Sequence, residues 1–271
     1  MQKFKRFASL HPLGFTFIIV LLFILVMGGA AALAAALLDY EVTDVTAQFI
    51  GQIAATVGLL VLLWRFGWLT KAGVTRLGHW RLWLLTLTLL VYNSLTALLA
   101  FFGTPWVSLN VSAATAPDLL HTTMAGVVEE LLFRGVILYA LVAGWRRFRW
   151  GPVAAVLVSA VLFGALHLVN LASGETSITL LQVFEAALSA ILYGALVWLE
   201  GSLWPAVLLH SGLNLLVNAA VLAEPAFAVT TTHFLWLILS DLPLALFGLY
   251  LLSKPWRQPG IPDGSSQMVR V

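Results

Sequence analysis

The chain has 271 residues, of which 61% are hydrophobic and only 10% are charged, and its mean hydropathy is +0.98. A composition this apolar excludes a soluble domain of this length and indicates a polytopic membrane protein. Cysteine is absent, which excludes disulfides and thiolate metal sites. The formal net charge is +2, and the excess of basic residues is a topology signal rather than a sign of nucleic-acid binding.

Hydropathy predicts an all-α fold with eight apolar segments of about 20 residues, the length that a membrane-spanning helix needs. The first begins after a basic start and is too long for a cleaved signal peptide, so we interpret it as a spanning helix. We expect one integral membrane domain over residues 1–271, with cytoplasmic tails at 1–11 and 253–271. The expected segments are residues 13–38, 46–64, 82–103, 119–142, 152–171, 178–199, 203–223 and 233–252.

Basic and acidic residues alternate between successive loops, and this sets the expected orientation. With eight spans and a cytoplasmic N-terminus, every basic residue except Arg134 falls on the cytoplasmic side. The sequence therefore predicts a multi-pass protein of a bacterial plasma membrane with both termini in the cytoplasm. The loops on the other side instead carry Asp39, Glu41, Asp44, Asp118, Glu175 and Glu224.

The fourth segment carries three charged residues in the run Glu129-Glu130-Leu131-Leu132-Phe133-Arg134. Each charge at the centre of a spanning helix costs about 2.5–3.5 kcal/mol on insertion scales, so these residues must be paired, hydrated or used in chemistry. Residues four apart share a helix face, so Glu130 and Arg134 can pair. Glu129 is turned about 100° away from Glu130 and can act as a general base. The alternative is a buried salt-bridge network that only locks two helices.

Two later segments contain isolated polar residues that could face the same site. His167 ends the run Phe163-Gly164-Ala165-Leu166-His167, and His210 and Asn214 share one helix face at i, i+4 spacing. Each of these groups could equally be an interhelical polar contact. For Glu185 and Asp241, in the sixth and eighth segments, we favour structural roles.

Taken together, EExxxR, FxxxH and HxxxN on three separate spans resemble the CAAX prenyl protease and bacteriocin-processing (CPBP or Abi) family, in its type II CAAX protease-like form. The signature positions are Glu129, Glu130, Arg134, Phe163, His167, His210 and Asn214, within a motif-bearing region of about residues 118–220.

The resemblance implies an intramembrane endopeptidase with its site among the fourth, fifth and seventh spans. Glu129 would activate the attacking water, and His167, His210 and Asn214 would hold that water or stabilise the oxyanion. Glu130 and Arg134 would brace the helix. The expected partners are a membrane-associated protein or peptide substrate and the lipid bilayer, without nucleic acid.

The same residues also allow three alternatives. We expect metal-free catalysis because no HExxH pair is present, and the alternative is Zn²⁺ held by Glu129, His167 and His210. The chain could also be a non-catalytic scaffold or bacteriocin-immunity factor of the same family. A transporter is disfavoured because no inverted repeat is evident.

Residue counting places the candidate groups at different depths in the membrane. Glu129 falls near the midplane, His210 nearer the cytoplasmic side and His167 nearer the outside. We expect helix tilt or displaced helix ends to bring Glu129, His167, His210 and Asn214 around one water-sized space.

Overall fold

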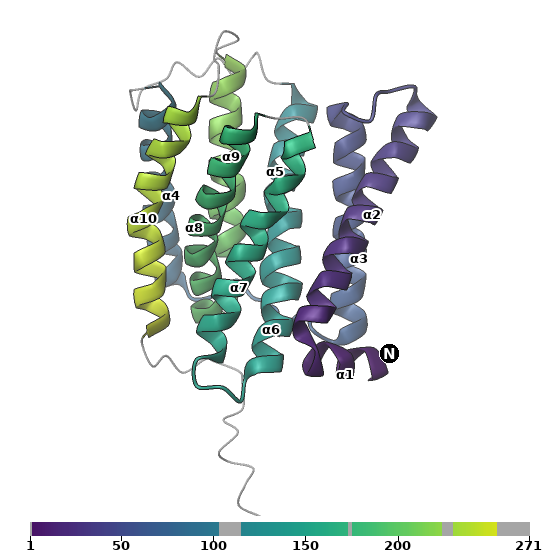
Figure 1. Cartoon of the computed structure of the whole chain (residues 1–271), viewed down its shortest axis with the longest axis vertical. Helices are drawn as coiled ribbons and strands as arrows, with labels where there is room; N and C mark the ends of the chain where they lie inside the picture. Colours follow the sequence, from purple (N-terminus) through teal and green to yellow (C-terminus); the bar gives the residue numbers. More distant parts are fainter. Residues whose placement is uncertain (1, 103–114, 173–174, 224–229, 254–271) are drawn as a thin grey trace, which may run out of the picture.

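A computed structural model describes residues 2–102, 115–172, 175–223 and 230–253, and every regular element in these ranges is helical. The long helices run alongside one another as a bundle (Figure 1). The expected C-terminal tail lies outside the described residues from position 254 onward. The elements are α1 Gln2–Leu10, α2 Pro12–Leu38, α3 Val45–Phe66, α4 Trp80–Phe102, α5 Ala116–Glu130, η2 Leu131–Ile137, α6 Leu138–Trp145, α7 Gly151–Leu166, η3 His167–Ala172, α8 Thr176–Glu200, α9 Trp204–Ala223 and α10 Thr231–Ser253.

Six of the described helices are long and apolar enough to cross a membrane, which confirms an all-α, multi-pass membrane protein. They are Pro12–Leu38, Val45–Phe66, Trp80–Leu99, Gly151–Ala172, Thr176–Glu200 and Thr231–Ser253, and each corresponds to one of the expected segments. The other two expected segments are also helical. One lies in the continuous run α5–η2–α6, and the other is α9. That these two also span the membrane stays a prediction.

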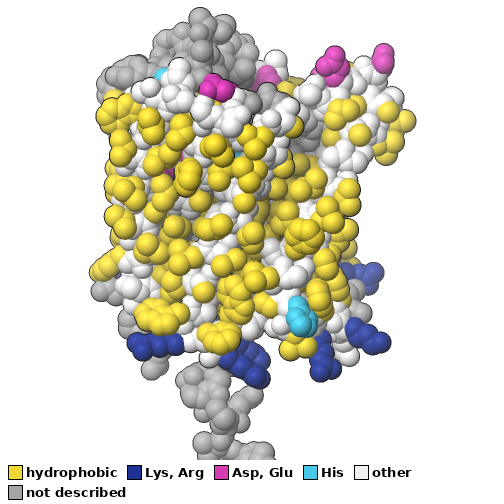
Figure 2. Space-filling view, viewed as in Figure 1, with side chains coloured by type: hydrophobic (Ala, Val, Ile, Leu, Met, Phe, Trp, Pro, Cys, Tyr) yellow, Lys and Arg dark blue, Asp and Glu magenta, His cyan; other side chains and the backbone are white. Residues whose placement is uncertain are grey.

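The two ends of the bundle carry opposite charges. Lys and Arg side chains gather at the end where α1 lies, whereas Asp and Glu side chains gather at the opposite end (Figure 2). The flanks between them are largely hydrophobic, as a surface in contact with lipid requires. This separation is the one expected from the sequence, and it supports the predicted orientation.

Within the expected cytoplasmic tail of residues 1–11, Gln2–Leu10 form the helix α1, which packs against α2 and α6. Phe4 holds α1 against the bundle, because its ring lies 5.6 Å from the ring of Phe15 and 5.7 Å from that of Phe66. An aromatic contact with two helices fixes the segment against the bundle.

The turn between α8 and α9 lies inside the protein rather than at its surface. Ser202 and Leu203 are buried, because the segment that links α3 to α4 folds over them. The Ser202 hydroxyl donates to the carbonyl of Arg76 at 2.6 Å, and the Leu203 amide donates to the carbonyl of Gly73 at 3.1 Å. The segment between α3 and α4 therefore covers the start of α9. The residues of α9 lie deeper in the membrane than a count from its first residue suggests.

Candidate active site

The helix that carries Glu129 and Glu130 changes its geometry directly after these residues. Helix α5 ends at Glu130, and Leu131–Ile137 form a π-helical segment before α6 begins. The amide of Leu138 donates to the carbonyl of Phe133, and the hydroxyl of Ser159 donates to the same carbonyl at 3.2 Å. Such π segments occur frequently at functional sites. The sequence pattern gave no indication of this one.

Glu130 and Arg134 form the ion pair that their spacing predicts. The distance from Arg134 Nη1 to Glu130 Oε1 is 2.9 Å, and both side chains are almost completely buried. The guanidinium of Arg134 lies 4.5 Å from the ring centroid of Phe163 and 5.5 Å from that of Tyr193. Two aromatic faces therefore hold the cation in place in addition to the carboxylate.

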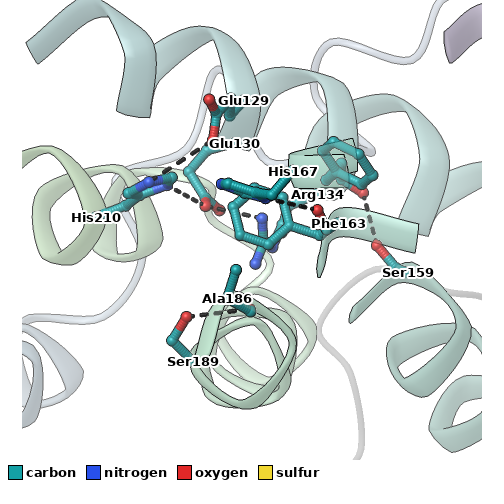
Figure 3. A network of polar contacts seen from close by, with 10 residues as sticks. Glu129, Glu130, Arg134, Ser159, Phe163, His167, Ala186, Ser189 and His210 are labelled. Carbon is teal, nitrogen blue, oxygen red and sulfur yellow. Dashed lines mark hydrogen bonds and ion pairs between the residues drawn. The ribbon is translucent and has the colours of Figure 1, made fainter. Parts of the chain in front are cut away.

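His210 joins the two neighbouring carboxylates. Its Nδ1 lies 2.9 Å from Glu130 Oε1, and its Nε2 lies 3.8 Å from Glu129 Oε2 (Figure 3). An ionised carboxylate can only accept, so Nδ1 is the donor and Nε2 is the atom that faces Glu129. The Glu130 carboxylate thus binds both the guanidinium of Arg134 and the imidazole of His210.

Glu129 differs from Glu130 in its surroundings. Its side chain is 24% exposed, whereas that of Glu130 is fully buried. The gap of 3.8 Å to His210 is too long for a direct hydrogen bond. Glu129 is therefore the carboxylate that is available to a water molecule or substrate, as its position on the helix predicted.

His167 is placed by the end of α7, where the helix gives way to the 3₁₀ segment η3. Its Nδ1 lies 3.0 Å from the carbonyl oxygen of Phe163. A carbonyl only accepts, so Nδ1 carries the proton and Nε2 presents a lone pair if the ring is neutral.

The ring of Phe163 contacts both imidazoles. Its ring lies 5.1 Å from that of His167 and 5.7 Å from that of His210, edge-on to both. Tyr193 on α8 stacks on His210 from another side, at 5.8 Å. The site thus includes a residue of α8 that sequence reasoning missed, because a lone tyrosine in an apolar helix carries no motif.

Helix α9 is held close to α5, and this aligns His210 with the two glutamates. A Cβ atom on Gly126 would lie 2.8 Å from the backbone nitrogen and 2.9 Å from the Cα of Ser211, so the approach requires glycine. The Ser211 hydroxyl donates to the carbonyl of Thr123 at 3.0 Å. Asn214 lies one turn after His210 on the same face of α9, is partly buried, and makes no hydrogen bond through its side chain within the described residues.

The structure therefore brings together most of the predicted site. Glu129, Glu130, Arg134 and His210 lie together, and His167 lies beside them in contact with Phe163 (Figure 3). The difference in depth expected for His210 is absent, because the α8–α9 turn is buried. A water-sized space shared with His167 and Asn214 stays a prediction.

The described part of the chain contains no set of side chains arranged to bind zinc. No three His, Cys, Asp or Glu side chains there form a group that could hold a metal ion. Glu129, His167 and His210 are therefore not arranged as three ligands of one ion.

Glu185 and Asp241 contact each other across the interface of α8 and α10. Their carboxyl groups are close enough to interact. Asp241 is buried, and neither residue forms an ion pair within the described residues. This arrangement supports the structural role that the sequence favoured.

Comparison with known proteins gives one match. Residues 113–216 match the family model described as type II CAAX prenyl endopeptidase Rce1-like. This range contains α5, η2, α6, α7, η3, α8 and the part of α9 that carries His210 and Asn214. No curated protein and no solved structure matches the chain.

Proposed function

Residues 113–216 form a domain of the Rce1-like type II CAAX prenyl endopeptidase family (CPBP), and from this membership we propose that the protein is an intramembrane endopeptidase. Its substrate would be a membrane-associated protein or peptide, and a water activated by Glu129 would hydrolyse the peptide bond. We further propose eight membrane crossings with both termini in the cytoplasm, on the basis of the charge separation in Figure 2.

The observation that carries this proposal is the pairing of a partly exposed carboxylate with a fixed imidazole. Glu129 Oε2 and His210 Nε2 are 3.8 Å apart, so one water molecule can lie within hydrogen-bond distance of both, at about 2.8 Å. Glu130 fixes the ring because it binds the other nitrogen. A purely structural salt bridge between helices would need neither the exposed Glu129 nor an imidazole directed at it.

The proposed reaction begins when Glu129 removes a proton from this water. The water oxygen then forms a bond to the carbonyl carbon of the substrate, and the carbonyl oxygen becomes an oxyanion. In its imidazolium form His210 carries a proton on each ring nitrogen, so its Nε2–H and the side-chain amide of Asn214 would donate to this oxyanion. When the C–N bond breaks, Glu129 returns the proton to the leaving nitrogen, so the carboxylate is regenerated.

His167 would have a different role from His210. Because its Nδ1 donates to the carbonyl of Phe163, the neutral ring offers Nε2 only as an acceptor. It would therefore orient the water by accepting one of its hydrogens rather than stabilise an oxyanion. Arg134 and Glu130 would not touch the substrate. Their charges would hold His210 in position.

Comparison of peptide termini in membranes tests this proposal. Membrane fractions from cells that make wild-type protein or the Glu129→Gln variant at equal levels would be compared by mass spectrometry of protein termini. We expect new termini that depend on Glu129. Identical termini, together with a phenotype that Glu129→Gln retains, would favour the non-catalytic scaffold.

A further inference from the structure

Helix α1 lies across the end of the bundle at which Lys and Arg gather (Figures 1 and 2). Phe4 and Ala8 face the protein, and Ala8 is only 1% exposed. Lys3 and Arg6 are exposed on its other side, and Lys5 lies with its ammonium 5.9 Å from the ring centroid of Phe66. A short helix with one apolar and one basic side is typical of the membrane interface.

The contact of α1 with α6 brings a second group of cations next to the first. A Cβ atom on Gly144 would lie 2.7 Å from Pro12 Cγ and 3.2 Å from the carbonyl oxygen of Ser9, so the end of α6 and the junction of α1 with α2 are in tight contact. Directly after α6 the chain carries three exposed arginines. The α1–α6 basic cluster is then Lys3, Lys5, Arg6, Arg146, Arg147 and Arg149.

These six charges have no compensating partner within the described part of the chain. None of them takes part in an ion pair there. The exposed acidic side chains lie at the opposite end of the bundle (Figure 2). Two large apolar side chains accompany the cluster, since Phe148 is 67% exposed and Trp150 is 60% exposed. Exposed aromatic residues beside cations are typical of the level of the lipid headgroups.

We propose that the α1–α6 basic cluster is a binding surface for the phosphate groups of anionic lipids, held between α1 and residues 146–149. The phosphate supplies the negative charge that the protein lacks at this place, and the acyl chains lie along the exposed apolar flank. A lipid bound there bridges α1 to the end of the continuous helix Ala116–Trp145, on which Glu129 lies. Because it contacts only the folded arrangement, the lipid stabilises the folded protein.

Binding of phosphatidylglycerol and phosphatidylcholine to the purified full-length protein tests this inference. The affinities in detergent would be measured by native mass spectrometry, together with the thermal stability at increasing lipid concentration. The test variant is Lys3→Gln/Arg6→Gln. The matched control is Lys71→Gln/Arg81→Gln, which removes two exposed cations that lie outside the cluster.

Each basic residue near an anionic surface contributes about fivefold to binding, so the test variant is expected to bind phosphatidylglycerol roughly 25-fold more weakly. The control variant should bind within about threefold of wild type. Phosphatidylcholine should bind weakly to all three proteins. Equal affinity of wild type and the test variant would overturn the inference and leave the cations a role only during membrane insertion. Equal loss in both variants, or protection by inorganic phosphate alone, would also contradict a lipid site at α1.

Discussion

Replacing Arg134 by alanine tests the buried ion pair of Glu130 and Arg134, which positions His210. The Glu130 carboxylate is fully buried, and Arg134 is the cation that neutralises it, at 2.9 Å. Removal of one partner of a buried ion pair costs about 3–5 kcal/mol, because the other charge stays buried without compensation. Loss of the cation over Phe163 and Tyr193 adds about 1 kcal/mol. We therefore expect the free energy of unfolding to fall by about 4–6 kcal/mol.

Unfolding in mixed micelles with increasing SDS, followed by tryptophan fluorescence, gives this quantity directly. The chain contains 11 tryptophans, so the signal is strong. Lys71→Ala is the matched control, since this lysine is exposed and lies outside the α1–α6 basic cluster, so its loss should change the free energy by less than about 0.5 kcal/mol.

A double variant separates the charge effect from the packing effect. Glu130→Gln/Arg134→Met removes both charges, keeps similar volumes and leaves a carbonyl oxygen that can accept from His210 Nδ1. Neutral replacement of a buried pair is often tolerated, so this variant should recover most of the stability that Arg134→Ala loses. An Arg134→Ala protein within about 1 kcal/mol of wild type would refute the reasoning.

Three further changes test other parts of the account. Val42→Cys should react with a membrane-impermeant thiol reagent only from the outside of intact cells, and labelling only from the cytoplasmic side would reverse the topology. Gly126→Ala should lower thermal stability and displace His210, because the new Cβ would lie only 2.8 Å from the backbone nitrogen of Ser211; unchanged melting would mean that α5 and α9 are not in close contact. Glu185→Gln/Asp241→Asn keeps the size and polarity of both side chains, so a variant at this structural pair should fold and cleave like wild type, and loss of cleavage with normal folding would contradict the structural role.

Local spacing predicted the features that depend on one helix. The pairing of Glu130 with Arg134 and the separate direction of Glu129 both follow from the period of a helix, and the structure contains both. The apolar segments likewise follow from the length of helix that crosses a bilayer, and six of them are present as expected.

Features that depend on contacts between helices were not predictable in the same way. His210 binds Glu130 across a sequence separation of 80 residues, and no single-sequence pattern specifies that contact. The depth of His210 was misjudged because the α8–α9 turn lies beneath the segment before α4. The π segment after Glu130 and the position of Tyr193 depend on how neighbouring helices pack, for which hydropathy has no signal.

The central claim is that Glu129 activates the water, and cleavage by purified protein tests it most directly. Wild type, Glu129→Gln and the exposed control Glu41→Gln would be reconstituted in liposomes with a substrate identified from the membrane termini. General-base catalysis contributes about 10²–10⁴-fold to a rate, so Glu129→Gln should cleave at least a hundredfold more slowly while it folds and melts like wild type. The control should cleave normally. Cleavage by Glu129→Gln at the wild-type rate would contradict the account.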